Sequence, residues 1–168
     1  GLLYGQSAKG LVRYAETSYG VKLDTEQAWQ ICRKFFDEYK HLREWHSQAK
    51  KDAGSNCEVL STKLGRKRWL PVEGDVQWQR FTALLNAPVQ GGAADVIKTA
   101  ITALQAKLPE DAGLVSTVHD ELIVEVPLKD AETVKKLVED VMIESAVTLY
   151  PTVPFEVEAH ICEDWSEK

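Results

Sequence analysis

The chain has 168 residues and a formal net charge of −6, and 44% of its residues are hydrophobic and 27% charged. This composition is ordinary for a globular domain, and no apolar run approaches the roughly 20 residues that a membrane span needs. The residues that follow Gly1 lack the basic region and apolar stretch of a signal peptide. We therefore expect a soluble, cytoplasmic protein without a membrane partner.

The charges are distributed unevenly along the chain. Residues 1–68 carry 13 Lys and Arg against 8 Asp and Glu, whereas residues 69–168 carry 7 against 18. A basic half beside an acidic half fits a phosphate-facing surface next to a cation-binding one. Two solvated faces of unequal charge explain the same composition, so both interpretations stay open at this point.

The first third of the chain has the pattern of helices. Ser7 is placed to begin a helix that Gly20 ends, and Asp24 with Gln27 resembles a capping box. Apolar residues then recur at helical spacing through one long helix that is expected to end near residues 54–56; they are Ala28, Ile31, Cys32, Phe35, Tyr39, Leu42, Trp45 and Ala49.

The middle of the chain combines an extended segment with a helix. Residues 57–71 look extended around a turn at Gly65, and four cations crowd that turn: Lys63, Arg66, Lys67 and Arg68. A helical stretch follows from about residue 76 to 107. Pro88 and the Gly91-Gly92 pair interrupt it, so we expect a kink or two helices that meet there.

The last third predicts a hairpin, a helix and a strand. Residues 114–118 and 122–126 are β-rich runs around a tight connection, and Asp130 is placed to cap a helix that the prolines at 151 and 154 end. Residues 155–162 alternate like a final strand with one wet face. This order of elements predicts an α+β fold with an antiparallel sheet covered by helices on one face.

The strongest chemical signal is His119-Asp120-Glu121 between the two predicted strands. Two adjacent carboxylates at a hairpin tip attract a cation, and phosphoryl transfer uses such carboxylates to hold Mg²⁺. An ordinary surface turn explains the tripeptide equally well, because Asp is a favoured turn residue.

Five segments in register resemble the family A DNA polymerases, of the bacterial DNA polymerase I and bacteriophage kind. Leu-Leu-Tyr-Gly-Gln-Ser at residues 2–7 resembles the end of that family's fingers helix motif, and Leu-Gly-Arg-Lys-Arg-Trp-Leu-Pro at 64–71 resembles its basic hairpin. Asn-Ala-Pro-Val-Gln-Gly-Gly-Ala-Ala-Asp at 86–95 resembles its palm helix motif. Residues 118–126 resemble the third motif, and Asp164-Trp165 the usual C-terminal ending.

The resemblance implies that the chain is the C-terminal part of a DNA-directed DNA polymerase. Its parts would be fingers-derived helices at residues 1–56 and a palm at residues 57–168. The implied reaction is template-directed addition of deoxynucleotides to a primer 3′-hydroxyl, in replication or repair. The implied partners are primer–template DNA and a deoxynucleoside triphosphate, and the implied cofactor is Mg²⁺ in a two-metal site.

The resemblance also implies roles for single residues. Asp120 would be a catalytic metal ligand supported by Glu121, and His119 would lie against the primer terminus. Tyr4 would stack beside the templating base. The basic hairpin would contact backbone phosphates through Arg66, Lys67 and Arg68.

Asn86 and Gln90 would hydrogen-bond in the minor groove near the primer end, where contacts test the shape of a base pair without reading its sequence. Helix capping at Pro88 is the alternative for both residues. The family carries an arginine four positions before the motif asparagine, where this chain has Thr82. Arg80, two residues earlier, is the candidate DNA-binding replacement.

The family's first palm motif, with a second metal-binding aspartate, has no counterpart after Gly1, and neither do its nucleotide-binding Arg and Lys. We therefore expect the isolated chain to be inactive without an N-terminal polymerase fragment. A non-catalytic fragment that binds primer–template DNA is the alternative function. An RNA polymerase of the single-subunit phage type fits the segment at 86–95 less well.

Overall fold

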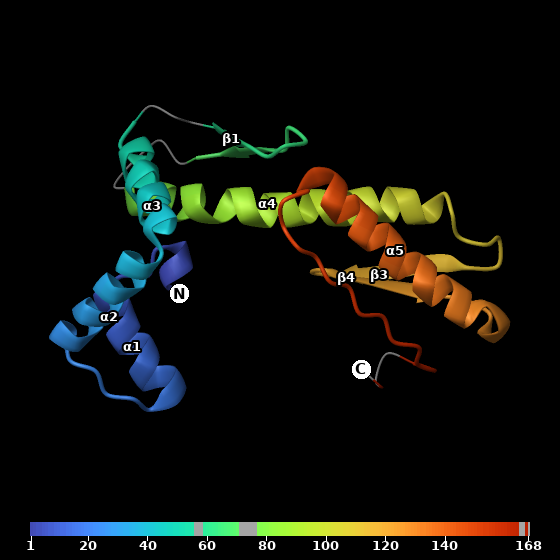
Figure 1. The fold of residues 1–168 in the computed structure, drawn as a ribbon, viewed down its shortest axis with the longest axis horizontal. Helices are drawn as coiled ribbons and strands as arrows, with labels where there is room; N and C mark the ends of the chain where they lie inside the picture. The colour runs from blue at the N-terminus through green and yellow to red at the C-terminus, as the bar shows by residue number, and fades with distance from the viewer. Residues whose placement is uncertain (56–58, 71–76, 165–166, 168) are drawn as a thin grey trace. The chain divides into compact units, whose positions relative to one another are not determined.

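The computed structural model describes the chain except residues 56–58, 71–76, 165–166 and 168 (Figure 1). The chain divides into two compact units, Gly1–Gln90 and Gly91–Lys168, each of which contains helical segments and a two-stranded antiparallel sheet. The predicted α+β class is therefore confirmed. The predicted fingers and palm parts, 1–56 and 57–168, have a different boundary, and that functional division stays a prediction.

Local capping sets the bounds of the first helical segments. A 3-10 helix, η1 (Leu2–Tyr4), ends at Gly5 in the left-handed conformation. The next helix, α1 (Ala8–Tyr19), begins after Ser7, whose hydroxyl accepts a backbone N–H, and ends at Gly20 with φ of 65°. The sequence predicted both ends of α1 because each depends on residues within one turn.

The long helix predicted after the capping box is wrong, because the structure contains two helices. α2 (Thr25–Glu38) begins at the predicted box, in which Asp24 and Gln27 exchange hydrogen bonds of 2.7 and 3.0 Å. α3 (Lys40–Ala53) follows after Tyr39, whose φ of −98° and ψ of 72° lie outside the helical region. The break contains neither glycine nor proline, and the apolar spacing continues across it, so the pattern did not mark it.

The predicted basic hairpin is present in the described residues. β1 (Val59–Ser61) pairs antiparallel with β2 (Lys67–Trp69), and Gly65 in the connection has φ of 78°. The ends of the predicted extended segment, 57–58 and 71, lie outside the described residues.

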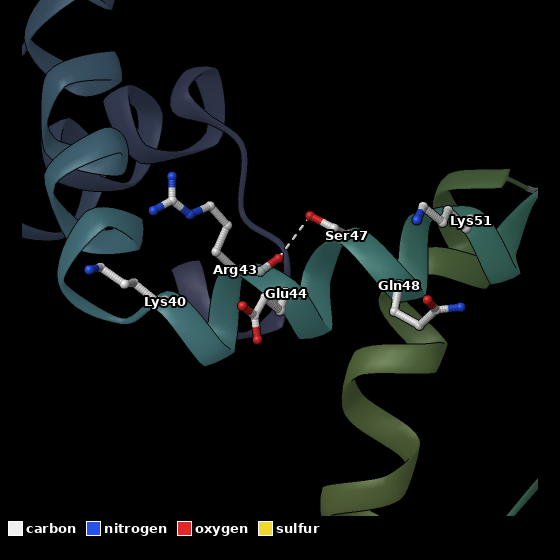
Figure 2. Close-up of a pocket in the computed structure, with 6 residues that line it drawn as sticks. All are labelled: Lys40, Arg43, Glu44, Ser47, Gln48 and Lys51. Atoms are coloured by element: carbon white, nitrogen blue, oxygen red, sulfur yellow. Dashed lines mark hydrogen bonds between the residues drawn. The ribbon is translucent and has the colours of Figure 1, made fainter.

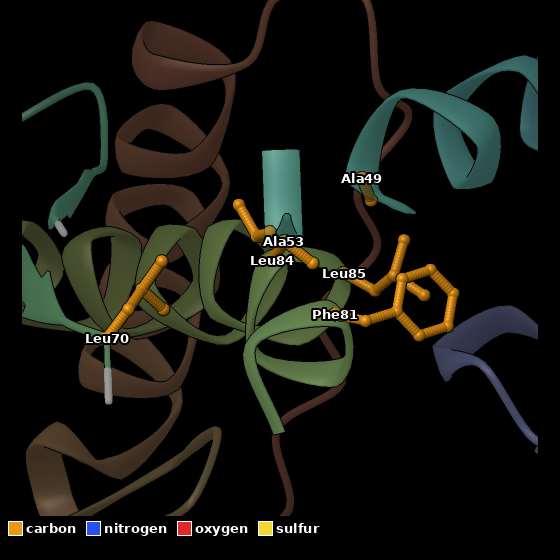
Figure 3. Close-up of a cluster of buried hydrophobic side chains, with 6 residues drawn as sticks. All are labelled: Ala49, Ala53, Leu70, Phe81, Leu84 and Leu85. Carbon is orange, nitrogen blue, oxygen red and sulfur yellow. The ribbon is translucent and has the colours of Figure 1, made fainter. Parts of the chain in front are cut away.

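A small apolar cluster packs α3 against the start of α4 in the first unit. Figure 3 shows its members, which come from α3, the segment after β2 and the first turns of α4: Ala49, Ala53, Leu70, Phe81, Leu84 and Leu85. Leu85 has no exposed surface. This cluster fixes the turn of α4 that directly precedes Asn86.

The sequence predicted either a kink or two helices at Pro88, and the second alternative is wrong, because a single helix, α4 (Gln77–Gln105), runs through this position. A proline removes one backbone hydrogen bond and crowds the preceding turn, which costs about 3 kcal/mol in a helix interior. Buried side chains on both sides of the proline, such as Leu85 and Leu104, stabilise the helix against that cost.

The second unit packs a β-hairpin against two helices. β3 (Gly113–Val118) and β4 (Glu121–Glu125) pair antiparallel, and α5 (Ala131–Leu149) lies beside them in Figure 1. The core joins α4 to α5 through Ala100, Leu104, Val134, Val138 and Val141, and hairpin residues Leu114, Leu122 and Val124 pack against it. The hairpin is thus covered by helices on one face, as predicted.

Two expectations for the C-terminal part are wrong. Asp130 lies in a 3-10 helix, η2 (Leu128–Asp130), and its side chain makes no capping hydrogen bond to α5. Residues 155–162 form no strand, although the exposure of residues 155–160 alternates as predicted. A hydrogen bond of 3.1 Å from Ala159 N to the Glu139 carboxylate connects this segment to α5, and it is not a strand pairing. None of the described helices is long and apolar enough to span a membrane.

Candidate functional site

The tip of the β3–β4 hairpin is a two-residue turn. Val118 pairs with Glu121 as the last pair of the ladder, so His119 and Asp120 form the connection. His119 has φ of 54°, the positive value that tight hairpin turns need and that glycine usually supplies. The structure therefore places the predicted catalytic residues together, and the ladder holds them at a defined position.

A β-bulge lies on the same hairpin, four residues before the first residue of the turn. Leu114 pairs with Val124 and Ser116 with Ile123, so Val115 is the extra residue on its strand. A bulge increases the local twist and redirects the side chains that follow it. The sequence did not predict this bulge, because an extra residue leaves the run of β-prone residues unbroken.

The two carboxylates differ in exposure. Asp120 is exposed at the tip, whereas Glu121 at the start of β4 is partly buried. Among the described residues, no group of three or more His, Cys, Asp or Glu side chains is arranged to hold a metal ion. The hairpin thus offers oxygen ligands of the kind that Mg²⁺ prefers, and the described part of the chain lacks the third ligand that would close a site.

The basic hairpin of the first unit exposes cations on β2. Lys67 and Arg68 are exposed, and they alternate in direction along the strand, so they cover both faces of this narrow ribbon. Arg66 is partly buried, and its backbone N–H donates to Thr62 Oγ1 at 3.2 Å. An exposed ribbon of this kind can contact phosphates without reading bases.

Asn86 and Gln90 share one face of α4. They are one helical turn apart and both are exposed, so their amide groups can contact one ligand. The alternative of capping at a break near Pro88 is wrong, because α4 continues through that position. The minor-groove role stays a prediction.

Arg80 is buried, unlike the exposed candidate DNA-binding residues Lys67, Arg68, Asn86 and Gln90. Its side chain is 6% exposed, and its guanidinium Nη2 donates to the Ser55 carbonyl oxygen at 2.8 Å. Thr82, at the position of the family's arginine, bonds back to its own helix at 3.1 Å. The predicted DNA contact of Arg80 therefore has little geometric support, because its guanidinium is engaged inside the first unit.

Tyr4 ends η1 and is 39% exposed. The next residue, Gly5, lies so close to α4 that a Cβ added there would come within 2.8 Å of Phe81 and 3.3 Å of Leu85. The structure thus brings the tyrosine segment against the α4 turn that precedes Asn86, a proximity that 80 positions of chain separation hid from the sequence.

His46 is a buried polar residue that the sequence reasoning missed. It is 6% exposed in α3, and its Nε2 lies 2.9 Å from the Leu3 carbonyl oxygen in η1. Burial lowers the pKa of His46, and the Lys50 ammonium acts in the same direction, against the hydrogen bond to Leu3. Its spacing from the buried Ala49 and Ala53 was the signal, since 46, 49 and 53 share one helix face.

Figure 2 shows an open hollow on the outer face of α3, lined by Lys40, Arg43, Glu44, Ser47, Gln48 and Lys51. Arg43 is already paired with Asp37 at 3.1 Å, and Glu44 places a carboxylate in the lining. None of the predicted site residues lines this hollow, and its mixed charge indicates no particular ligand.

Comparisons with known proteins cover almost the whole chain. The sequence model described as DNA polymerase family A matches residues 1–167. DNA polymerase I of Aquifex aeolicus is 38% identical over 99% of this chain and 28% of its own length. The thermostable DNA polymerase I of Thermus aquaticus is 36% identical over 98% of this chain and 19% of its own length.

A solved structure shares the fold. It is described as the POL domain of Pol1 from M. smegmatis in complex with DNA primer-template and dNTP, and it matches with a TM-score of 0.71 and 32% identity. The match covers 86% of this chain and 26% of that chain, so this chain spans less than a third of the proteins it resembles. The family match extends over the hairpin, the basic ribbon and the α4 face, and the chain belongs to DNA polymerase family A.

Proposed function

We propose that this chain is the C-terminal part of a DNA-directed DNA polymerase that extends a primer 3′-hydroxyl with deoxynucleotides. The observation that carries the proposal is the carboxylate pair at a rigid hairpin tip within a chain that matches the family over residues 1–167. The related M. smegmatis domain was solved with primer-template and dNTP, which supports the same ligands here. A bacterial relative supports a cytoplasmic location.

The proposed roles are assigned to residues of both units. Asp120 and Glu121 would hold Mg²⁺, which supplies neutralisation of charge on the attacking and leaving oxygens of phosphoryl transfer. His119, beside them in the turn, would orient the primer terminus. In the first unit, Tyr4 would stack on the templating base.

The proposed DNA contacts are of two kinds: some position the duplex, and others test the shape of a base pair. Exposed cations on β2, Lys67 and Arg68, with Arg66 in the turn, would bind backbone phosphates and set the register of the duplex. Asn86 and Gln90 would accept or donate hydrogen bonds in the minor groove, where similar acceptor positions in every base pair allow a test of pair shape.

We propose further that catalysis needs an N-terminal polymerase fragment. Two adjacent carboxylates and no three-residue metal cluster among the described residues support this, because a two-metal site requires additional ligands. The fragment would supply the second aspartate and the groups that bind the triphosphate.

Primer extension tests the proposal with two samples. One is the purified 168-residue chain, and the other is a fusion in which this chain replaces the matching segment of the Aquifex aeolicus relative. We expect extension of a labelled primer by the fusion and none by the chain alone. Extension by the chain alone would contradict the need for a partner. A folded fusion that binds primer–template yet never extends it would favour the non-catalytic DNA-binding alternative.

A further inference from the structure

His46 connects four elements of the first unit. It belongs to α3, its ring lies 4.9 Å from that of Phe36 in α2 and 5.8 Å from that of Phe81 in α4, and its Nε2 contacts η1 through the Leu3 carbonyl oxygen. Figure 3 shows Phe81 in the apolar cluster between α3 and α4. A single polar side chain is therefore embedded where the tyrosine segment meets the helices.

The hydrogen bond defines which nitrogen carries the proton. A carbonyl oxygen can only accept, so Nε2–H donates to Leu3 O over 2.9 Å. The ring is held edge-on to its aromatic neighbours, at 61° to Phe36 and 79° to Phe81. The imidazole thus has a fixed orientation and a fixed tautomer in the neutral state.

The surroundings disfavour a second proton on this ring. The neighbours from α2 and α4 are the apolar rings of Phe36 and Phe81, and η1 presents a backbone carbonyl. The charged group that faces the ring is the Lys50 ammonium of the same helix, which lies 5.7 Å from the Phe81 ring centroid. An imidazolium would be a buried cation beside another cation.

We propose that His46 is a positioning residue for Tyr4, which holds η1 in place through the hydrogen bond from its Nε2–H to the Leu3 carbonyl oxygen. Leu3 and Tyr4 are consecutive residues of one helical turn, so fixing the carbonyl of the first restricts the second. The relevance for nucleotide addition rests on the proposed function, in which Tyr4 stacks on the templating base.

The direction in which stability depends on pH follows from burial. An unfolded histidine has a pKa of about 6.5, and burial lowers the pKa of His46 in the folded chain. The unfolded chain therefore binds this proton at a higher pH than the folded chain does. Stability from the neutral ring is complete above about pH 6.5 and is lost as the pH falls from there towards the lower folded pKa.

Three variants test the role of the hydrogen bond. His46→Gln keeps an N–H donor of similar reach and cannot be protonated, whereas His46→Phe keeps an aromatic ring and has no donor. The matched control is His41→Gln, because His41 is a fully exposed histidine of the same helix. The probes are the amides of Tyr4 and Gly5, which donate to Gly1 and Leu2 within the η1 turn.

Protection of these two amides from hydrogen exchange, corrected for intrinsic rates, is measured by NMR at pH 7.5 in the folded 168-residue chain. We expect His46→Phe to lower the protection about tenfold, on the scale of one hydrogen bond. His46→Gln should keep the native protection, because its side-chain N–H can donate to the Leu3 carbonyl oxygen, and His41→Gln should follow the native chain.

Either of two results would overturn the proposal. One is a folded His46→Gln variant whose η1 protection falls about tenfold below that of the native chain although the side-chain donor is kept. The other is a folded His46→Phe variant with native protection at pH 7.5. If His46→Phe does not fold, the comparison of native chain and His46→Gln decides alone. The readout uses no DNA, so failed primer extension would leave this proposal intact.

Discussion

The contact of Gly5 with α4 shows how single residues position the tyrosine segment. Gly5 has φ of 90°, in the left-handed region that only glycine adopts freely, and Phe81 occupies the space that a Cβ would need. The sequence placed Tyr4 at the end of a motif but could not show this contact. His46 was missed for a related reason, since helical periodicity marks apolar residues and a lone histidine on the buried face is read as polar.

Gly5→Ala should lower the free energy of unfolding by about 2–4 kcal/mol, of which about 1–2 is backbone strain and the rest the overlap with Phe81. Gly20→Ala is the matched control, because Gly20 also has positive φ, of 65°, but no atom within 4 Å of an added Cβ. Urea denaturation measures both variants. Equal decreases in the free energy of unfolding for Gly5→Ala and Gly20→Ala would show that Gly5 does not pack against α4.

At the scale of helices and strands, the predictable features were those encoded within a few residues. Ser7, Gly20 and the Asp24–Gln27 pair each act within one turn, and the structure has the predicted caps. The break at Tyr39 was not predictable, because no residue there is a helix breaker. The segment at 155–162 alternates like a strand, but a strand also requires a partner, and its pattern does not contain one.

Asp24→Ala should lower the free energy of unfolding by about 1 kcal/mol, because it removes the cap acceptor that bonds Gln27 N at 2.7 Å. Asp130→Ala is the control: Asp130 stands at the corresponding position before α5, but its side chain makes no capping bond there. We expect a change below about 0.5 kcal/mol for the control. Thermal denaturation followed by circular dichroism measures both variants. If Asp130→Ala lowers the free energy of unfolding as much as Asp24→Ala does, the capping role of Asp24 is contradicted.

For the whole molecule, the family was evident from the sequence because five motifs occur in order, and the comparisons show it over residues 1–167. The roles of individual residues were harder to predict from the sequence. The motif predicted that His119, Asp120 and Glu121 lie together at the hairpin connection, whereas the carbonyl partner of Arg80 inside the first unit is visible only in the structure. The chain covers 28% of the length of the Aquifex aeolicus relative.

We propose that Asp120 at the hairpin tip is a metal ligand of the polymerase reaction. The most direct test of this role is the rate of primer extension by the fusion enzyme carrying Asp120→Asn, with Asp111→Asn as the control at another exposed aspartate of the second unit. We expect Asp120→Asn to lower the rate at least about 10²-fold, as loss of a key electrostatic group does, with unchanged primer–template affinity. Asp111→Asn should keep the rate of the parent fusion. An Asp120→Asn enzyme that extends primers as fast as the Asp111→Asn control would contradict the assignment.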